Sequence, residues 1–141
     1  MSILLDTNVV SELLRKQPDA AVLAWFAAQP ADTLCICAVT QAEMLLGARL
    51  LPAGKRRQQL QSALDGMFAD DFNGRVWPFD AAAAAGFADI VATRCAAGRP
   101  ISQFDAQIAA IARLRGAVLA TRNTADFEGC GLMLHNPWLR A

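Results

Sequence analysis

Four acidic residues stand where apolar stretches of the chain give way to polar residues. Asp6 directly follows the apolar residues 3–5, and Asp126 follows the apolar residues 117–120 after a short polar segment. Glu43 and Asp105 are expected in the first turns of two helices. In open α/β sheets, ligands bind at the carboxyl ends of the strands. These four acids are therefore the candidates for catalysis or metal binding.

Carboxylates that share a pocket repel one another, and something must relieve the repulsion. Two such groups about 4 Å apart repel by about 4 kcal/mol at an effective dielectric constant of about 20. Either protons or a bound cation would remove this cost. Oxygen ligands without histidine or cysteine suit Mg²⁺ or Mn²⁺ better than zinc. Such ions activate water and stabilise charge on a phosphodiester, which favours metal-dependent nuclease chemistry.

Each acid also has a purely structural interpretation. Residues 40–43 and 102–105 both fit a capping box, in which a hydroxyl and an acidic side chain satisfy free amides at the start of a helix. Asp126 fits a turn equally well. We favour a shared site because helix caps do not require four acids at one edge of a sheet. In addition, Asp6 directly follows three apolar residues.

Missing residues disfavour several other enzyme classes. His135 is the only histidine, so a histidine pair within one chain is impossible and a Ser-His-Asp triad is not expected. The phosphate-binding patterns GxxxxGK and GxGxxG are absent. A phosphate-accepting receiver needs a lysine at a strand end, whereas Lys16 and Lys55 fall in expected helices. A phosphatase of the DxD class would need an acid in place of Asn8.

The hydrophobic pattern predicts a scaffold that brings strand ends together. Short apolar runs alternate with Ala-rich helical segments, which favours an α/β fold with a mainly parallel sheet. Strands are expected at residues 2–6, 34–39, 75–78, 117–121 and 132–135. Helices are expected at about residues 7–16, 19–28, 43–51, 55–69, 81–97 and 104–114. In the second helix, four side chains are expected to point into the core: Val22, Leu23, Trp25 and Phe26.

Length and charge predict one globular domain, residues 1–141, without a global attraction for nucleic acid. Hydrophobic residues make up 55% of the chain, and a domain of this length buries about two-thirds of its extended surface. Thirteen basic and thirteen acidic residues cancel, so any polyanion must be held locally. Arg99 and Arg122, near the expected acidic cleft, are candidates for contacting the phosphates of such a polyanion. Residues 55–57 are expected to form a solvated helix face.

No segment predicts insertion into a membrane or export. The amino terminus lacks a basic segment followed by a long apolar stretch, and residues 81–88 are too few and too rich in alanine to span a bilayer. We therefore expect a cytoplasmic protein without membrane contact. The cysteines lack metal-ligand spacing and are expected to be reduced core or loop residues; they are Cys35, Cys37, Cys95 and Cys130.

Four segments in order resemble the PIN-domain family: LLDTNVVSE, VTQAEMLLG, ISQFDAQIAAIA and LATRNTADF. They are most similar to the bacterial VapC-like and FitB-like toxins of type II toxin–antitoxin systems, over essentially the whole chain. The resemblance implies a three-layer α/β/α sandwich around a mainly parallel sheet. It also implies endoribonuclease activity with Mg²⁺, for which Mn²⁺ is a substitute. As partners it implies a second copy in a homodimer and a cognate DNA-binding antitoxin that occludes the active site.

The resemblance also implies roles for individual residues. Asp6, Glu43 and Asp105 would be the principal metal-site acids, and Asp126 a fourth catalytic acid supporting a second ion. Many PIN domains carry an acid two residues after the threonine, where this chain has Asn123, so the second ion site is expected to be weak. Supporting residues would orient ligands or water; they are Thr7, Asn8, Thr121 and Asn123.

Two alternatives stay open at this point. Phe104 precedes Asp105 and could stack on a nucleobase, although an aromatic residue in the first turn of an apolar helix more often packs inward. The chain could also be a catalytically silent interaction module whose acids bind an arginine of a partner. Metal-dependent turnover would separate that module from a nuclease.

Overall fold

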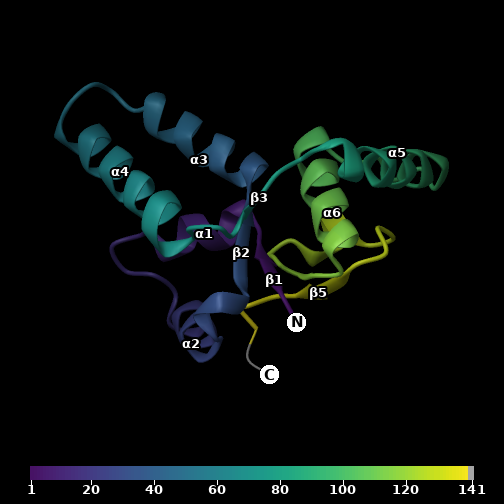
Figure 1. The fold of residues 1–141 in the computed structure, drawn as a ribbon, viewed down its shortest axis with the longest axis horizontal. Coiled ribbons are helices and arrows are strands. Elements are labelled where there is room, and N and C mark those ends of the chain that lie inside the picture. The colour runs from purple at the N-terminus through teal and green to yellow at the C-terminus, as the bar shows by residue number, and fades with distance from the viewer. Residues whose placement is uncertain (140–141) are drawn as a thin grey trace.

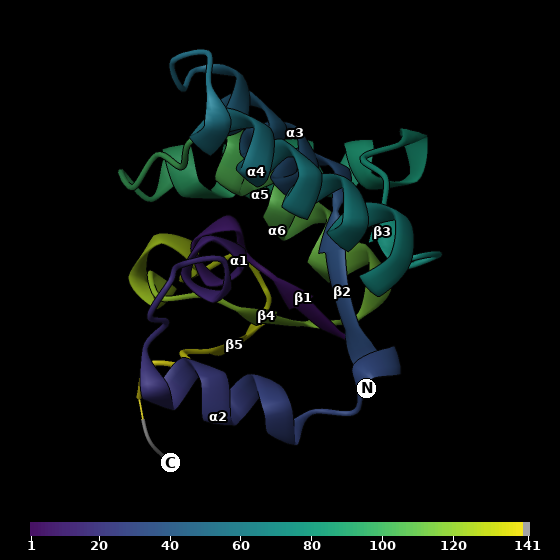
Figure 2. The ribbon, with the colours of Figure 1, turned by 90° about the vertical axis from the view of Figure 1, so that its left-hand side faces the viewer.

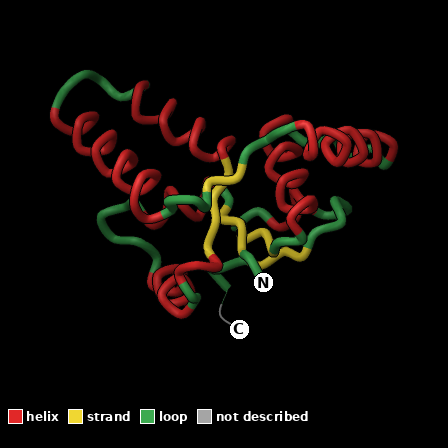
Figure 3. Tube along the Cα trace, viewed as in Figure 1, coloured by secondary structure: helices red, strands yellow, loops and turns green. Residues whose placement is uncertain are grey.

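The computed structural model describes residues 1–139, and a five-stranded sheet forms its centre. In this part of the chain the strands are β1 (Ile3–Leu5), β2 (Leu34–Cys37), β3 (Val76–Trp77), β4 (Val118–Ala120) and β5 (Met133–His135). All neighbouring strands are parallel, in the order β3-β2-β1-β4-β5. Figure 3 shows the strands in yellow at the centre, with helices in red around them. The predicted parallel sheet is confirmed.

Helices cover both faces of this sheet. Within residues 1–139 there are six α-helices: α1 (Thr7–Leu13), α2 (Ala20–Ala28), α3 (Ala38–Arg49), α4 (Lys55–Gly66), α5 (Ala81–Ala96) and α6 (Gln103–Arg115). α3 and α4 lie side by side as an arm on one side of the sheet, while α5 and α6 pack together on the other (Figure 1). Figure 2 shows α2 at the opposite end of the molecule from α3 and α4. The expected three-layer α/β/α arrangement is confirmed.

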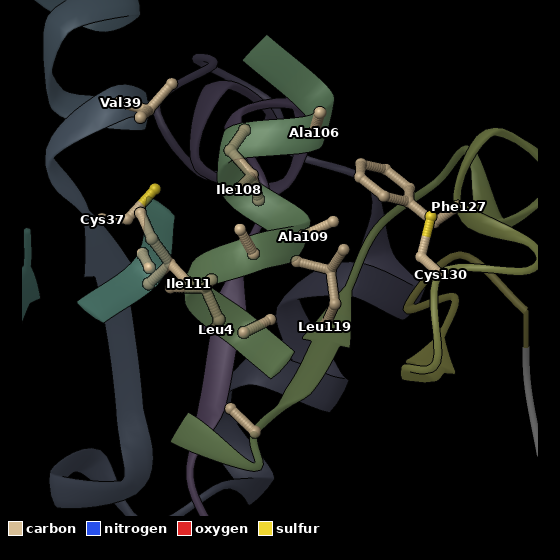
Figure 4. Close-up of a cluster of buried hydrophobic side chains, with 14 of the residues drawn as sticks. Leu4, Cys37, Val39, Ala106, Ile108, Ala109, Ile111, Leu119, Phe127 and Cys130 are labelled. Carbon is tan, nitrogen blue, oxygen red and sulfur yellow. The ribbon is translucent and has the colours of Figure 1, made fainter. Parts of the chain in front are cut away.

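Alternation along the strands builds a separate apolar core on each face of the sheet. Successive side chains of a strand point to opposite faces. Leu4 therefore packs into the core under α5 and α6, whereas Leu5 packs into the core under α1, α2 and α4. Figure 4 shows the first core, in which Ile111 of α6 and Leu119 of β4 gather with Leu4. Burying each of these side chains contributes about 1.5–3 kcal/mol.

The boundary between β2 and α3 differs from the prediction. Cys37 ends β2, and α3 begins at Ala38 rather than near residue 43. The β-branched residues Val39 and Thr40 favour a strand locally, but both are buried in the helix, where packing outweighs local propensity. Glu43 consequently lies in the second turn of α3 and not in the first. The capping box expected at residues 40–43 is not formed.

The helix expected at residues 55–69 is also shorter than predicted. α4 ends at Gly66, and a separate π-helical turn follows at Met67–Asp71. The amide of Phe72 donates to the Met67 carbonyl oxygen at 2.9 Å, which closes this wider turn. The side chains of Met67, at the start of this turn, and Phe72, directly after it, are buried in the core under α1, α2 and α4. The wider turn thus lets the chain bury two large side chains before it enters β3.

Two apolar side chains that were expected to pack inward are exposed. Leu23 is 43% exposed and Phe104 is 52% exposed. An α-helix turns by about 100° per residue, so one helix cannot bury every apolar position. In α2 the buried face contains Val22, and Phe26 packs against the same core four residues later. In α6 the buried residues begin at Ala106, so Phe104 lies beyond the covered part of the helix.

The described part of the chain forms neither a membrane span nor a disulfide. None of the helices within residues 1–139 combines the length and the apolar character that crossing a bilayer requires. Cys35, Cys37 and Cys130 are buried, Cys95 is exposed, and all four are free. Burial of Cys35, Cys37 and Cys130 agrees with the expected core positions, whereas Cys95 lies exposed on α5 rather than in the core or a loop.

The strand order places a crevice at the carboxyl ends of β1 and β4. From β1 the chain continues to β2 and β3 on one side of the sheet, and then to β4 and β5 on the other. Ligands of parallel sheets bind where the order reverses in this way. The register pairs Leu5 with Ala120, so the next residues, Asp6 and Thr121, emerge beside each other. The amide of Asp6 donates to the Ala120 carbonyl oxygen at 2.9 Å.

Candidate active site

Asp6 is the centre of a hydrogen-bonded group at the ends of β1 and β4. Its Oδ1 accepts from the Thr7 amide at 2.8 Å, and its Oδ2 accepts from Thr121 Oγ1 at 2.7 Å. Thr121 Oγ1 in turn accepts from the Asn123 amide at 3.1 Å and from Asn8 Nδ2 at 3.3 Å. Asp6 is only 5% exposed. These contacts hold the carboxylate in one orientation at the floor of the crevice.

A second chain of hydrogen bonds holds Glu43. Thr7 Oγ1 donates to Glu43 Oε1 at 2.9 Å and lies 3.0 Å from Thr40 Oγ1. The Cys37 thiol donates to Thr40 Oγ1 at 3.6 Å. The buried Thr40 side chain therefore links α3 to α1 through its hydroxyl group. The sequence pattern had suggested only a helix-capping role for Thr40. Its position three residues before Glu43, on the same helix face, is the sequence signal that could have shown this role.

Asp6 and Asp105 both lie at the start of a helix and also line the cleft. Asp6 is the N-cap of α1. Ser102 caps α6 by accepting from the Asp105 amide at 3.2 Å, as the capping box predicts, but the Asp105 side chain lines the cleft. A helix N-terminus carries partial positive charge, which favours carboxylates placed beside it. The two helix starts thus help to position the acids.

Asp6, Glu43 and Asp105 line one open cleft of about 400 Å³. The other lining residues come from α1 and the segment after it, the loop after β4 and the segment after β5: Thr7, Asn8, Ser11, Glu12, Arg15, Arg122, Asn123 and Trp138. Four of these lining residues were not predicted from the sequence: Ser11, Glu12, Arg15 and Trp138. The first three follow Asn8 at helical spacing, which could have indicated them. Trp138 reaches the cleft only through the fold, so no local pattern predicts it.

Asp126 and Arg99 occupy places outside the walls of this cleft. Asp126 is exposed in the 3₁₀ turn Thr124–Phe127, close enough to Asp105 to raise its pKa. Arg99 Nη2 pairs with Glu128 Oε2 at 3.2 Å, so its side chain is tied to the loop after the 3₁₀ turn. The structure thus brings three of the four predicted acids into one cleft, and one of the two predicted arginines, Arg122.

The protonation of the cleft acids reflects burial and mutual repulsion. Burial is the main cause that raises the pKa of Asp6 from 3.8 to about 6. The hydrogen bonds that it accepts oppose this rise, and the negative charges of Asp105 and Glu43 add to it. Burial also raises the pKa of Asp105. These directions agree with the geometry, in which the three carboxylates line one cleft.

Asp6 makes the stability of the metal-free protein depend on pH. Because its pKa is higher in the folded than in the unfolded state, stability present below about pH 4 is lost as the pH rises through about 6. The ionised carboxylate then costs about 3 kcal/mol. We expect thermal unfolding in EDTA to show this loss for the wild type and not for Asp6→Asn. A difference between the two proteins that stays constant over this pH range would contradict the assignment.

The donor atoms of the cleft suit a hard cation, although they do not enclose one. Asp6, Glu43 and Asp105 offer carboxylate oxygens, the ligands that Mg²⁺ and Mn²⁺ prefer. Within residues 1–139, no three acidic, histidine or cysteine side chains converge into a complete set of ligands. Mg²⁺ is commonly held by one or two carboxylates, with water and substrate phosphates as the remaining ligands. An open group of acids is compatible with this kind of binding.

Comparisons with known proteins identify the family. The family model described as "PIN domain" matches residues 3–128. The chain belongs to the PIN-domain family. Over 136 residues this PIN domain is 46% identical to the VapC ribonuclease Y4jK of Sinorhizobium fredii, covering 96% of the chain and 97% of that protein. It is 39% identical to the toxin FitB of Neisseria gonorrhoeae, covering 96% of the chain and 98% of FitB.

The solved structures agree with this family membership. A chain from the structure of FitAB bound to the IR36 DNA fragment superposes on this PIN domain with a TM-score of 0.93 and 38% identity. The match covers 99% of this chain and 97% of the other. The predicted resemblance to the PIN-domain family and to VapC-like and FitB-like toxins is therefore confirmed.

Proposed function

We propose that this PIN domain is a Mg²⁺-dependent endoribonuclease and the toxin of a type II toxin–antitoxin pair. The convergence of Asp6, Glu43 and Asp105 on one cleft at the reversal of the strand order is the observation that carries the proposal. The similarity to a protein named VapC ribonuclease supports RNA as the substrate.

Each cleft acid has a distinct part in this proposal. Asp6 and Asp105 would hold the cation, and Thr121 keeps the Asp6 carboxylate in place through its 2.7 Å hydrogen bond. Glu43 is a further ligand or orients the attacking water, because Thr7 holds its Oε1 and leaves Oε2 for this task. When bound, Mg²⁺ supplies charge that lowers the pKa of water and stabilises the negative charge developing on the phosphate. Water would attack the phosphorus in line, so that the P–O bond to the opposite ribose oxygen breaks as the new one forms, and the proton given up by the water would restore the hydroxyl of that leaving oxygen.

Asp105 and Asp126 provide a paired test of this assignment. We expect Asp105→Asn to slow cleavage of a mixed RNA pool in Mg²⁺ by at least about 100-fold, because it removes a carboxylate from the reacting centre. Asp126→Asn is expected to change the rate by less than about 5-fold, because Asp126 is exposed outside the cleft walls and at most supports a second ion. Single-turnover kinetics measure both rates, and circular dichroism checks the folds. A wild-type rate for folded Asp105→Asn would overturn the assignment.

The partners follow from the same proposal. A cognate DNA-binding antitoxin occludes the cleft, and the toxin acts as a homodimer in the cytoplasm, where its RNA substrate is found. The structural similarity to a chain of FitAB bound to a DNA fragment supports a partner of this kind. Co-expression with the product of an adjoining small gene should yield a complex in which RNA cleavage is suppressed.

A further inference from the structure

Arg122 and Trp138 form a stacked pair in the wall of the acidic cleft. The guanidinium carbon of Arg122 lies 5.1 Å from the centre of the Trp138 ring. Both residues line the cleft together with Asp6, Glu43 and Asp105. Arg122 follows β4 and Trp138 follows β5, so the sheet brings the two segments together. The acids themselves belong to other segments.

The side-chain amide of Asn136 clamps both members of the pair. Its Nδ2 donates to the Arg122 carbonyl oxygen at 3.3 Å, and its Oδ1 accepts from the Trp138 amide at 2.9 Å. The Arg122 amide also donates to Asn8 Oδ1 at 3.4 Å. The backbone on both sides of the stack is therefore fixed relative to α1, which also carries the Asp6 cap. These three hydrogen bonds therefore hold the backbone of Arg122 and of Trp138 in place, so that the two side chains meet.

Arg122 makes no ion pair with any other residue of the described range, although it lies in the same cleft as Asp6, Glu43 and Asp105. Within residues 1–139, the ion pairs involve Arg15, Arg99 and Arg113. Arg122 is exposed, and the face of the Trp138 ring attracts its guanidinium. A planar cation held in this way offers a surface on which an unpaired nucleobase can stack and donors that a phosphate can accept. Nucleic acids carry both groups, and an unpaired strand presents them side by side.

We propose that the Arg122–Trp138 pair binds an unpaired segment of RNA beside the scissile phosphate. Arg122 contacts the RNA, through a base stacked on its guanidinium and through the adjoining phosphate. Trp138 is a positioning residue that acts by holding Arg122 away from the carboxylates. This inference rests on the proposed function and deepens it, because it assigns the element that selects unpaired RNA. Bases in a duplex are stacked on one another and do not offer their faces.

The test compares steady-state kinetics of pair variants on an unpaired RNA oligonucleotide in Mg²⁺. Arg122→Ala and Trp138→Leu are each expected to raise KM by about 10-fold, in the range of one lost stacking contact, with little change in kcat. Trp138→Phe retains an aromatic face and should recover most of the loss. Fluorescence anisotropy of the same oligonucleotide, with each change made in Asp105→Asn protein, measures binding without cleavage. A duplex of the same sequence should bind all variants equally weakly.

Arg115 and Trp77 provide a matched control for this test. The Arg115 guanidinium carbon lies 5.0 Å from the centre of the Trp77 ring, in the same kind of stack. Neither residue lines the acidic cleft. Arg115→Ala removes a comparable charge and a comparable stack, and it should leave both KM and RNA binding unchanged.

The possible outcomes separate this inference from the proposed function. If the wild type cleaves RNA while Arg122→Ala and Trp138→Leu keep its KM and its RNA affinity, the pair is not a substrate-binding element, although the nuclease function stands. A lower melting temperature with an unchanged KM would assign the pair a purely structural role and would also overturn the inference. If folded wild-type protein neither binds nor cleaves RNA, both the inference and the proposed function are wrong.

Discussion

Asp6→Asn should lose at least about 1,000-fold in RNA cleavage while its fold becomes no less stable at neutral pH. The carboxylate is buried, and its pKa of about 6 means that ionisation opposes folding at that pH. A neutral amide removes a cost of about 3 kcal/mol. It also disturbs the bond from Thr121, which offsets about 1 kcal/mol of this gain. A net increase of about 2 kcal/mol in the free energy of unfolding follows.

Cleavage kinetics and urea unfolding in EDTA measure the two effects of Asp6→Asn separately. Asp89→Asn is a suitable control, because Asp89 is exposed on α5 and its ion-pair distance to Arg113 is 3.9 Å. It should change neither the rate nor the stability appreciably. Loss of both activity and stability in Asp6→Asn would indicate that Asp6 mainly supports the fold. An active Asp6→Asn protein would show that the reacting centre lies elsewhere.

Arg94→Met should destabilise the protein by about 3 kcal/mol or more. Arg94 is only 6% exposed, and its guanidinium has backbone carbonyls as its main partners. The carbonyl oxygens of Arg99 and Asp126 each accept from it at 2.7 Å, and that of Glu128 accepts at 3.0 Å. Methionine fills a similar volume but leaves these buried carbonyls without a donor. The loop after β4 would then lose its attachment to α5.

Urea unfolding at neutral pH measures this loss, with Arg99→Met as the matched control. Arg99 lies in the same region, but its ion pair with Glu128 is about half exposed, so its replacement should cost less than about 1 kcal/mol. Similar losses in the two variants would show that the carbonyl contacts of Arg94 contribute little.

The sequence predicted the central part of the site because the strands end abruptly. The apolar run before Asp6 and the one before Thr121 mark two adjacent parallel strands, so their last residues had to meet at one sheet edge. Asp105 follows a recognisable helix cap at Ser102. These features depend on local patterns of polarity, which a single sequence contains.

Other features depended on tertiary contacts that no local pattern encodes. Val39 indicated the end of a strand, but burial placed it in α3. Arg94 lies in an Ala-rich helix like any solvated residue, and only the loop folded over it shows that it is buried. The sequence fitted Asp126 to a fourth catalytic acid and to a turn equally well, and the structure places it in a 3₁₀ turn, exposed outside the cleft walls. Trp138 enters the cleft because β5 pairs with β4.

The most direct test of the central claim is the rate at which the purified, partner-free wild type cleaves a mixed RNA pool with Mg²⁺, with EDTA, and after Mg²⁺ is restored. The account predicts cleavage with Mg²⁺, loss of cleavage in EDTA, and recovery on restoring the ion. Cleavage that persists in EDTA would contradict the role of the carboxylate cleft as a cation site. Absence of cleavage by folded protein in Mg²⁺ would contradict the nuclease function and favour a silent interaction module.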